Sequence, residues 1–190
     1  MSIGGVAEVQ NDQVIDDLIQ VWTIGHSTRL IDDFIEALAS ENITSLVDVR
    51  SFPSSKRLPH FNQRELSEAL AVAGLEYMHL PELGGRRPAR KDSPNTAWQN
   101  PGLRGYADYM ETEAFRAGID RLLEVAASQR TAIMCAEAVW WRCHRSLISD
   151  YLKSKGVIVT HILSATKTEP HPYTSAARIV DGELSYRGLF

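Results

Sequence analysis

Residues 134–146 read MCAEAVWWRCHRS and contain both cysteines of the chain. Cys135 ends an apolar, β-prone stretch, and a helical pattern begins shortly after it. The charged groups nearest to the start of that helix are Arg142, His144 and Arg145. Arginines and the free N–H groups at a helix start both favour a thiolate over a thiol, and the thiolate is the nucleophilic form of cysteine. The segment therefore predicts a reactive thiol at a strand end.

Short apolar stretches alternate with helical patterns along the chain. We predict strands over residues 20–25, 44–49, 76–80, 131–135 and 157–162. We predict helices over residues 31–38, 62–73, 105–127 with a break near Thr112, and 143–155; residues 62–65 resemble a capping box. This order predicts an α/β fold: a single three-layer domain with a mostly parallel five-stranded sheet, helices on both faces, and a C-terminal β-hairpin at Asp181-Gly182.

Residues 1–19 are expected to be an N-terminal extension, and residues 20–190 a single domain with a long loop at 81–102. This loop lacks periodicity, is rich in proline and glycine, and is locally basic. Loops of this length are commonly functional lids or solvated surface segments, and both interpretations stay open. As a lid, the loop would close over an anionic ligand.

Composition limits the classes of function. The formal net charge of −4 gives no overall cationic field for nucleic acid, although a local basic patch remains compatible with one. Two cysteines are too few for a disulfide framework, so reduced thiols in the cytoplasm are expected, and a bond between the two stays open as an alternative. The chain starts without a signal-peptide pattern and has no apolar run of the ~20 residues that span a membrane. We expect a cytoplasmic protein with no membrane partner.

Polar residues follow each predicted strand, and the carboxyl ends of parallel strands meet at one edge of a sheet, where ligands bind. Cys135 is the candidate nucleophile. His26 or His144 would transfer protons, and Glu137 would orient one of them. The residues expected to bind an anionic ligand are Ser27, Arg50, Ser51, Arg57, Arg86, Arg87, Arg142 and Arg145.

The arrangement of strand, cysteine loop and helix resembles that of rhodaneses and cysteine phosphatases, and SLVDVR at residues 45–50 is similar to the DVR strand of rhodanese domains. A second resemblance covers nearly the whole chain. The segments TIGHS (23–27), DVRSFPS (48–54), CAE (135–137), CHR (143–145) and HPYT (171–174) together resemble the domain-of-unknown-function family 488. That resemblance implies an α/β fold and a prokaryotic protein, and it implies no activity.

Four hypotheses for the site remain open. The first is a cysteine-dependent enzyme acting on a phosphorus- or sulfur-bearing substrate. The second is a module that binds a nucleotide or a nucleic-acid end, with Trp98, Trp140 or Trp141 stacking on bases. The third is a zinc set drawn from the two cysteines, His144 and His26, a weak signal because no CxxC pair is present. The fourth is an inert buried thiol. We expect no cofactor and no resident metal, and the oligomeric state is left open.

Overall fold

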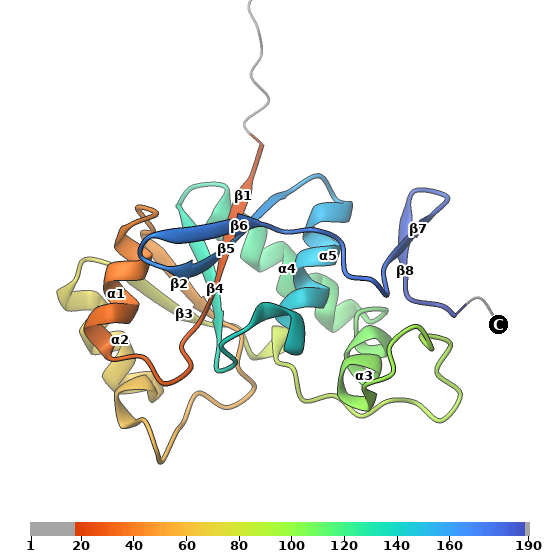
Figure 1. The fold of residues 1–190 in the computed structure, drawn as a ribbon, viewed down its shortest axis with the longest axis horizontal. Coiled ribbons are helices and arrows are strands. Elements are labelled where there is room, and N and C mark those ends of the chain that lie inside the picture. The colour runs from red at the N-terminus through yellow and green to blue at the C-terminus, as the bar shows by residue number, and fades with distance from the viewer. Residues whose placement is uncertain (1–17, 189–190) are drawn as a thin grey trace, which may run out of the picture.

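Six strands form one sheet in the computed structural model, which describes residues 18–188. The strands are β1 (Gln20–Gly25), β2 (Ser45–Asp48), β3 (Glu76–His79), β4 (Thr131–Cys135), β5 (Ile158–Ser164) and β6 (Lys167–Pro170). Their order across the sheet is β3-β2-β4-β1-β5-β6 (Figure 1). The first five strands run parallel, so their carboxyl ends lie at one edge as expected.

The sixth strand corrects the predicted count of five. β6 pairs antiparallel with β5 at the edge of the sheet, which is mixed and, as predicted, mostly parallel. Its sequence KTEP is polar, mostly exposed and ends in proline, so it carries no alternation of apolar residues. Edge strands commonly have this composition because only one side of their backbone is paired.

Helices cover both faces of the sheet. The helices are α1 (Ile31–Ala39), α2 (Gln63–Val72), α3 (Pro101–Tyr109), α4 (Glu113–Ala126) and α5 (Arg145–Ser154), with short 3₁₀ turns η1 (Pro59–Phe61), η2 (Pro81–Leu83) and η3 (Trp140–Arg142). One buried cluster holds apolar residues of α1 and α2, and the other holds those of α3, α4 and α5. Within residues 18–188, no helix is long and apolar enough to cross a membrane.

Alternation along each strand builds these two cores. In β1, Val21 belongs to the cluster of α3, α4 and α5, whereas Trp22 and Ile24 belong to the cluster of α1 and α2. Successive side chains of a strand point to opposite faces, and here both faces are covered. The structure thus has the three-layer arrangement that the sequence predicts.

Turn and cap residues explain several element boundaries. Thr112 caps α4 by accepting a hydrogen bond from the N–H of Phe115 at 3.3 Å, which produces the predicted break. Asp181 and Gly182 have φ angles of 51° and 83°. Two successive positive φ angles are typical of a tight hairpin turn, here between β7 (Arg178–Val180) and β8 (Glu183–Ser185), and the predicted hairpin is confirmed.

The long segment after β3 is fixed to α3. Asp108 accepts hydrogen bonds from the N–H of Arg90 at 2.8 Å, from Ser93 Oγ and from Asn95 Nδ2 at 2.9 Å. The N–H of Ala97 also donates to the carbonyl of Tyr186 near the C-terminus. These hydrogen bonds favour a segment that stays in place, and they argue against residues 81–102 opening as one lid.

Candidate functional site

A cavity of about 430 Å³ lies at the carboxyl edge of the sheet, where β1, β2 and β4 end. Seven of the residues expected from the sequence line it: His26, Arg50, Arg86, Cys135, Glu137, Arg142 and His144. Cys143, Phe52 and Asn100 also line it. A volume of this size is typical of a site for a small ligand.

Five expected residues lie outside the lining of this cavity: Ser27, Ser51, Arg57, Arg87 and Arg145. Arg87 stacks its guanidinium on the ring of Tyr109 at 3.7 Å and donates to the carbonyl of Gly84. Ser51 Oγ accepts a hydrogen bond from the N–H of Arg86, so it holds the backbone of a residue that lines the cavity. The side chain of Arg145 is buried and directed at the cysteines.

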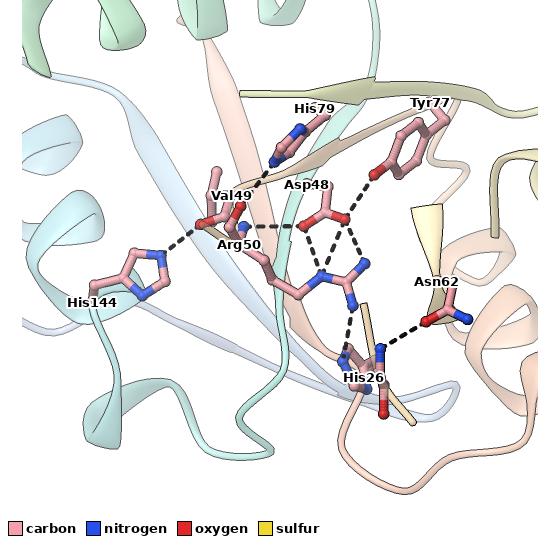
Figure 2. A network of polar contacts seen from close by, with 9 residues as sticks. His26, Asp48, Val49, Arg50, Asn62, Tyr77, His79 and His144 are labelled. Atoms are coloured by element: carbon pink, nitrogen blue, oxygen red, sulfur yellow. Dashed lines mark hydrogen bonds and ion pairs between the residues drawn. The ribbon is translucent and has the colours of Figure 1, made fainter. Parts of the chain in front are cut away.

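Arg50 is held rigidly by Asp48, which is fully buried (Figure 2). Its Nη2 and Nε lie 2.6 Å and 2.9 Å from the two carboxylate oxygens, a bidentate geometry that fixes the plane of the guanidinium. Tyr77 donates its hydroxyl to the same carboxylate, and burial, reinforced by the charge of Asp48 and this bond, raises the pKa of Tyr77. Because Asp48 compensates much of its charge, Arg50 orients neighbours more than it attracts anions.

His26 lies against Arg50 and stacks on Phe61 with ring centroids 4.2 Å apart. Its Nδ1 lies 2.9 Å from the carbonyl of Ser27, which only accepts, so Nδ1 carries the proton. The Nε2 lone pair then faces Arg50 Nη1 at 3.4 Å. Burial, with Arg50 adding to it, lowers the pKa of His26 to about 4, so the ring is neutral at pH 7.

The two cysteines form a contacting pair. Cys135 Sγ and Cys143 Sγ lie 3.2 Å apart, and both residues are buried. Arg145 Nε lies 3.0 Å from the first sulfur and 3.3 Å from the second. Its Nη2 donates to the carbonyl of Glu137 at 2.6 Å, which ties the loop after β4 to the start of α5. A buried cation therefore lies against two sulfurs, an arrangement that stabilises one negative charge shared between them.

The pKa values of the two thiols move in opposite directions. The contact with the Cys135 sulfur, together with Arg145, holds the pKa of Cys143 well below its usual range despite burial. Burial, and the contact with Cys143, raise the pKa of Cys135. The sequence expects the lowered pKa at Cys135, whereas these directions favour the thiolate at Cys143, two residues before α5 begins.

Alkylation tests this assignment. In the wild-type protein, iodoacetamide should label Cys143 first, at a rate that reaches its maximum at a lower pH than for a free thiol and falls as the pH drops through the lowered pKa. Peptide mapping after partial reaction identifies the labelled cysteine. In the Cys143→Ser variant, labelling of Cys135 should be slow and should rise with pH. Equal labelling of both cysteines in the wild type would contradict the assignment.

His144 lines the cavity between the two cysteines and the end of β2. Its Nε2 lies 2.9 Å from the carbonyl of Val49 and carries the proton (Figure 2). A Cβ added at Gly85 would overlap the other ring nitrogen, so this nitrogen is covered by backbone. Burial lowers the pKa of His144, which keeps the ring neutral. The carboxylate of Glu137 makes no recorded hydrogen bond to either histidine within the described residues.

Cys135, Cys143 and His144 place their ligand atoms within 4.8 Å of one another, the spacing of a metal site. His26, which the sequence added to this set, is not part of the group. Arg145 already supplies both sulfurs with positive charge, and a metal ion would have to displace it. The donor set therefore fits a metal less well than it fits a guanidinium.

A second buried network contacts the loop between Cys135 and Cys143 through Trp140. His161 contacts Thr23 Oγ1 at 2.7 Å and His171 at 2.9 Å, and His171 contacts Asp150 at 3.0 Å. Trp140 of the loop stacks on His161, with centroids 4.2 Å apart and planes 6° apart. Burial, with the neighbouring His171, lowers the pKa of His161 to about 2, so this platform stays neutral. None of Trp98, Trp140 and Trp141 lines the cavity.

Sequence reasoning included Cys143 only among possible zinc ligands and left it out of the expected catalytic residues. Cys143 directly precedes His144 and Arg145 at a predicted helix start, where a thiolate is favoured, and this signal was sufficient to include it. Phe52 and Asn100 had no such signal, because they enter the cavity from loops whose course depends on tertiary contacts.

A family model described as "Domain of unknown function DUF488" matches residues 30–152. The match includes β2, the segment before α3, and the cysteine loop with the start of α5, and it ends before β5. Neither the curated proteins nor the solved structures include a significant match to the chain.

Proposed function

Because the chain belongs to the DUF488 family, whose description gives no activity, we propose a function from the geometry of the cavity: it binds a small anion beside a reactive thiolate. The observation that carries the proposal is the placement of Arg86 and Arg142. Both line the cavity next to the cysteines, both are exposed, and neither has an ion pair within the described residues. Glu137 is the opposing charge in the lining, so cationic side chains predominate.

The proposed chemistry is cysteine-dependent attack on a sulfur or phosphorus centre of the bound anion. Cys143 would be the nucleophile, since it has the lowered pKa and lines the cavity. His26, with its lone pair on Nε2 and a neutral ring at pH 7, is the candidate for proton transfer. Arg145 keeps the nucleophile ionised and leaves the binding of the anion to Arg86 and Arg142.

Anion binding is tested with the Arg86→Ala/Arg142→Ala double variant. Charge-assisted hydrogen bonds are worth about 1.5–3 kcal/mol each, so removing both side chains should weaken the binding of sulfate or phosphate by ~10-fold or more. Isothermal titration calorimetry measures the affinity. Thermal stability should change little, because both side chains lie at the surface.

The matched control is the Lys56→Ala/Lys91→Ala variant. It removes the same amount of charge from two exposed residues outside the cavity. Its affinity should equal that of the wild type apart from a small effect of net charge. Equal loss of affinity in both double variants would show general charge attraction and would contradict a cavity that binds the anion.

The second candidate is a nucleotide-binding module without nucleophilic chemistry. It is favoured by Phe52, which is exposed in the lining with the guanidinium of Arg86 5.7 Å from its ring centroid. A base could stack on this ring while the arginines contact phosphates. Under this alternative, a Phe52→Ala variant would lose affinity for a nucleoside monophosphate and retain affinity for inorganic phosphate.

A further inference from the structure

The cysteine pair has more than the single thiol that nucleophilic attack requires. The chain contains two cysteines, and the fold places both sulfurs 3.2 Å apart at the wall of the cavity. A disulfide has an S–S distance of ~2.05 Å, so an approach of about 1 Å would join them. The residues that would move lie in the loop between the two cysteines, where residues 136–138 are exposed to solvent.

The contacts of the pair give its members different roles. Cys143 lies beside the N-terminus of α5 and accepts a hydrogen bond from Arg145 at 3.3 Å, and both contacts favour a thiolate at this position. Burial raises the pKa of Cys135, and its sulfur contacts that of Cys143. An attacking thiolate and a resolving thiol in contact are the two components of a thiol–disulfide exchange centre.

A second thiol at this distance distinguishes a sulfur substrate from a phosphorus substrate. If Cys143 accepted a phosphoryl group, Cys135 would have no bond to make, and water would have to complete the reaction. If Cys143 accepts a thiol group, the product is a disulfide, and the neighbouring Cys135 is in place to attack it. Arg145 supports the same conclusion, because its donors face the two sulfurs and Glu137 and do not line the cavity.

Building on the proposed anion-binding cavity, we propose that Cys143 and Cys135 form a dithiol/disulfide couple that reduces a small disulfide carrying negative charge. In the first step the Cys143 thiolate attacks one sulfur of the substrate R–S–S–R. A Cys143–S–S–R bond forms, the substrate S–S bond breaks, and R–S⁻ leaves with the electron pair.

In the second step Cys135 attacks Cys143 Sγ. The Cys135–Cys143 bond forms, the bond between Cys143 and the substrate sulfur breaks, and the proton of Cys135 leaves on the second product as R–SH. Two electrons pass from the pair to the substrate. A dithiol reductant, small or protein-borne, would restore the pair by the reverse exchange.

The experiment uses the reduced full-length protein and 5,5′-dithiobis(2-nitrobenzoate), a small disulfide with two carboxylates whose released thiol is coloured. The wild type should release two equivalents of coloured thiol per chain, and intact mass should show loss of two hydrogens with no adduct. The Cys135→Ser variant should release one equivalent and keep the adduct on Cys143. The Cys143→Ser variant should react much more slowly than either.

Further measurements separate this proposal from the proposed function. Wild-type protein that releases one equivalent and keeps the adduct would overturn the couple, even if sulfate binds in the cavity. Tight binding of Zn²⁺ that blocks both thiols in the protein as purified would overturn it in favour of a metal site. If a neutral disulfide, bis(2-hydroxyethyl) disulfide, also yields the internal disulfide in wild type and in Arg86→Ala/Arg142→Ala at equal rates, the couple stands. If those arginine replacements also leave the rate with the charged probe unchanged, the anionic substrate is excluded.

Discussion

Replacement of Asp150 by alanine is expected to destabilise the protein by about 3–5 kcal/mol, the usual cost of breaking a buried ionic or hydrogen-bonded network. Asp150 is fully buried in α5, and its carboxylate accepts from His171, from the N–H and hydroxyl of Thr174, and from the hydroxyl of Tyr186. The side chain of Asp150 therefore attaches residues 171–186 to α5. Urea denaturation, followed by circular dichroism, measures the free energy of unfolding.

The control is Tyr186→Phe, which removes one of these donors and leaves the carboxylate in place. The loss of a single hydrogen bond should cost about 1 kcal/mol. The two variants should therefore differ by a factor of three or more in their effect. An Asp150→Ala variant that is no less stable than Tyr186→Phe would show that the carboxylate does not hold the segment.

Replacement of Arg145 by methionine should raise the pKa of Cys143 and reduce its reactivity at neutral pH. Arg145 is buried, and its Nε is the cation that contacts both sulfurs. A thiol whose pKa lies one unit above the pH is only about one-tenth ionised. The midpoint of the labelling pH profile should move upward, and the rate at pH 7 should fall by ~10-fold once the pKa lies about one unit above that pH.

Arg142→Met is the matched control for this change. It removes the same charge from a residue that is exposed and has no recorded contact with either sulfur. Its pH profile should stay close to that of the wild type. A shift of equal size in both variants would mean that general positive charge, rather than the buried guanidinium, sets the pKa.

The fold was largely predictable because local patterns and tertiary structure agree. The parallel strands are short, and they alternate with helices whose apolar residues repeat at helical spacing. Turn chemistry was equally informative: Thr112 caps α4, and Asp181-Gly182 adopts the positive φ angles of the hairpin turn. Each of these signals depends on a residue's own conformational preference, so no distant contact is needed to read it.

Local patterns failed to predict features that depend on contacts outside the element itself. The predicted capping box at residues 62–65 did not form, because Asn62 Oδ1 accepts from the N–H of Ser55, 2.6 Å away. The edge strand β6 has no apolar pattern, since it pairs on one side only. Neither feature can be derived from the neighbouring residues alone.

The candidate site shows the same division. Polar residues at the ends of parallel strands are expected to converge, and His26, Arg50 and Cys135 do line one cavity. The rule gives the edge but not the direction of long side chains: Arg87 turns to Tyr109, and Arg145 turns to the sulfurs. The acidity of the thiols depends on contacts of about 3 Å between residues on different elements, which only the folded structure provides.

The strand order has a consequence for how the protein forms during synthesis. β4 lies between β1 and β2, and these two strands do not pair with each other among the described strands. A growing chain that has not yet reached residues 131–135 can pair β2 with β3, but it leaves β1 without either of its neighbours, β4 and β5. Closing these long-range contacts is slow because the chain entropy must be lost first. His26 and Arg50 are therefore translated before β4, and the cavity is completed only when β4 inserts between β1 and β2.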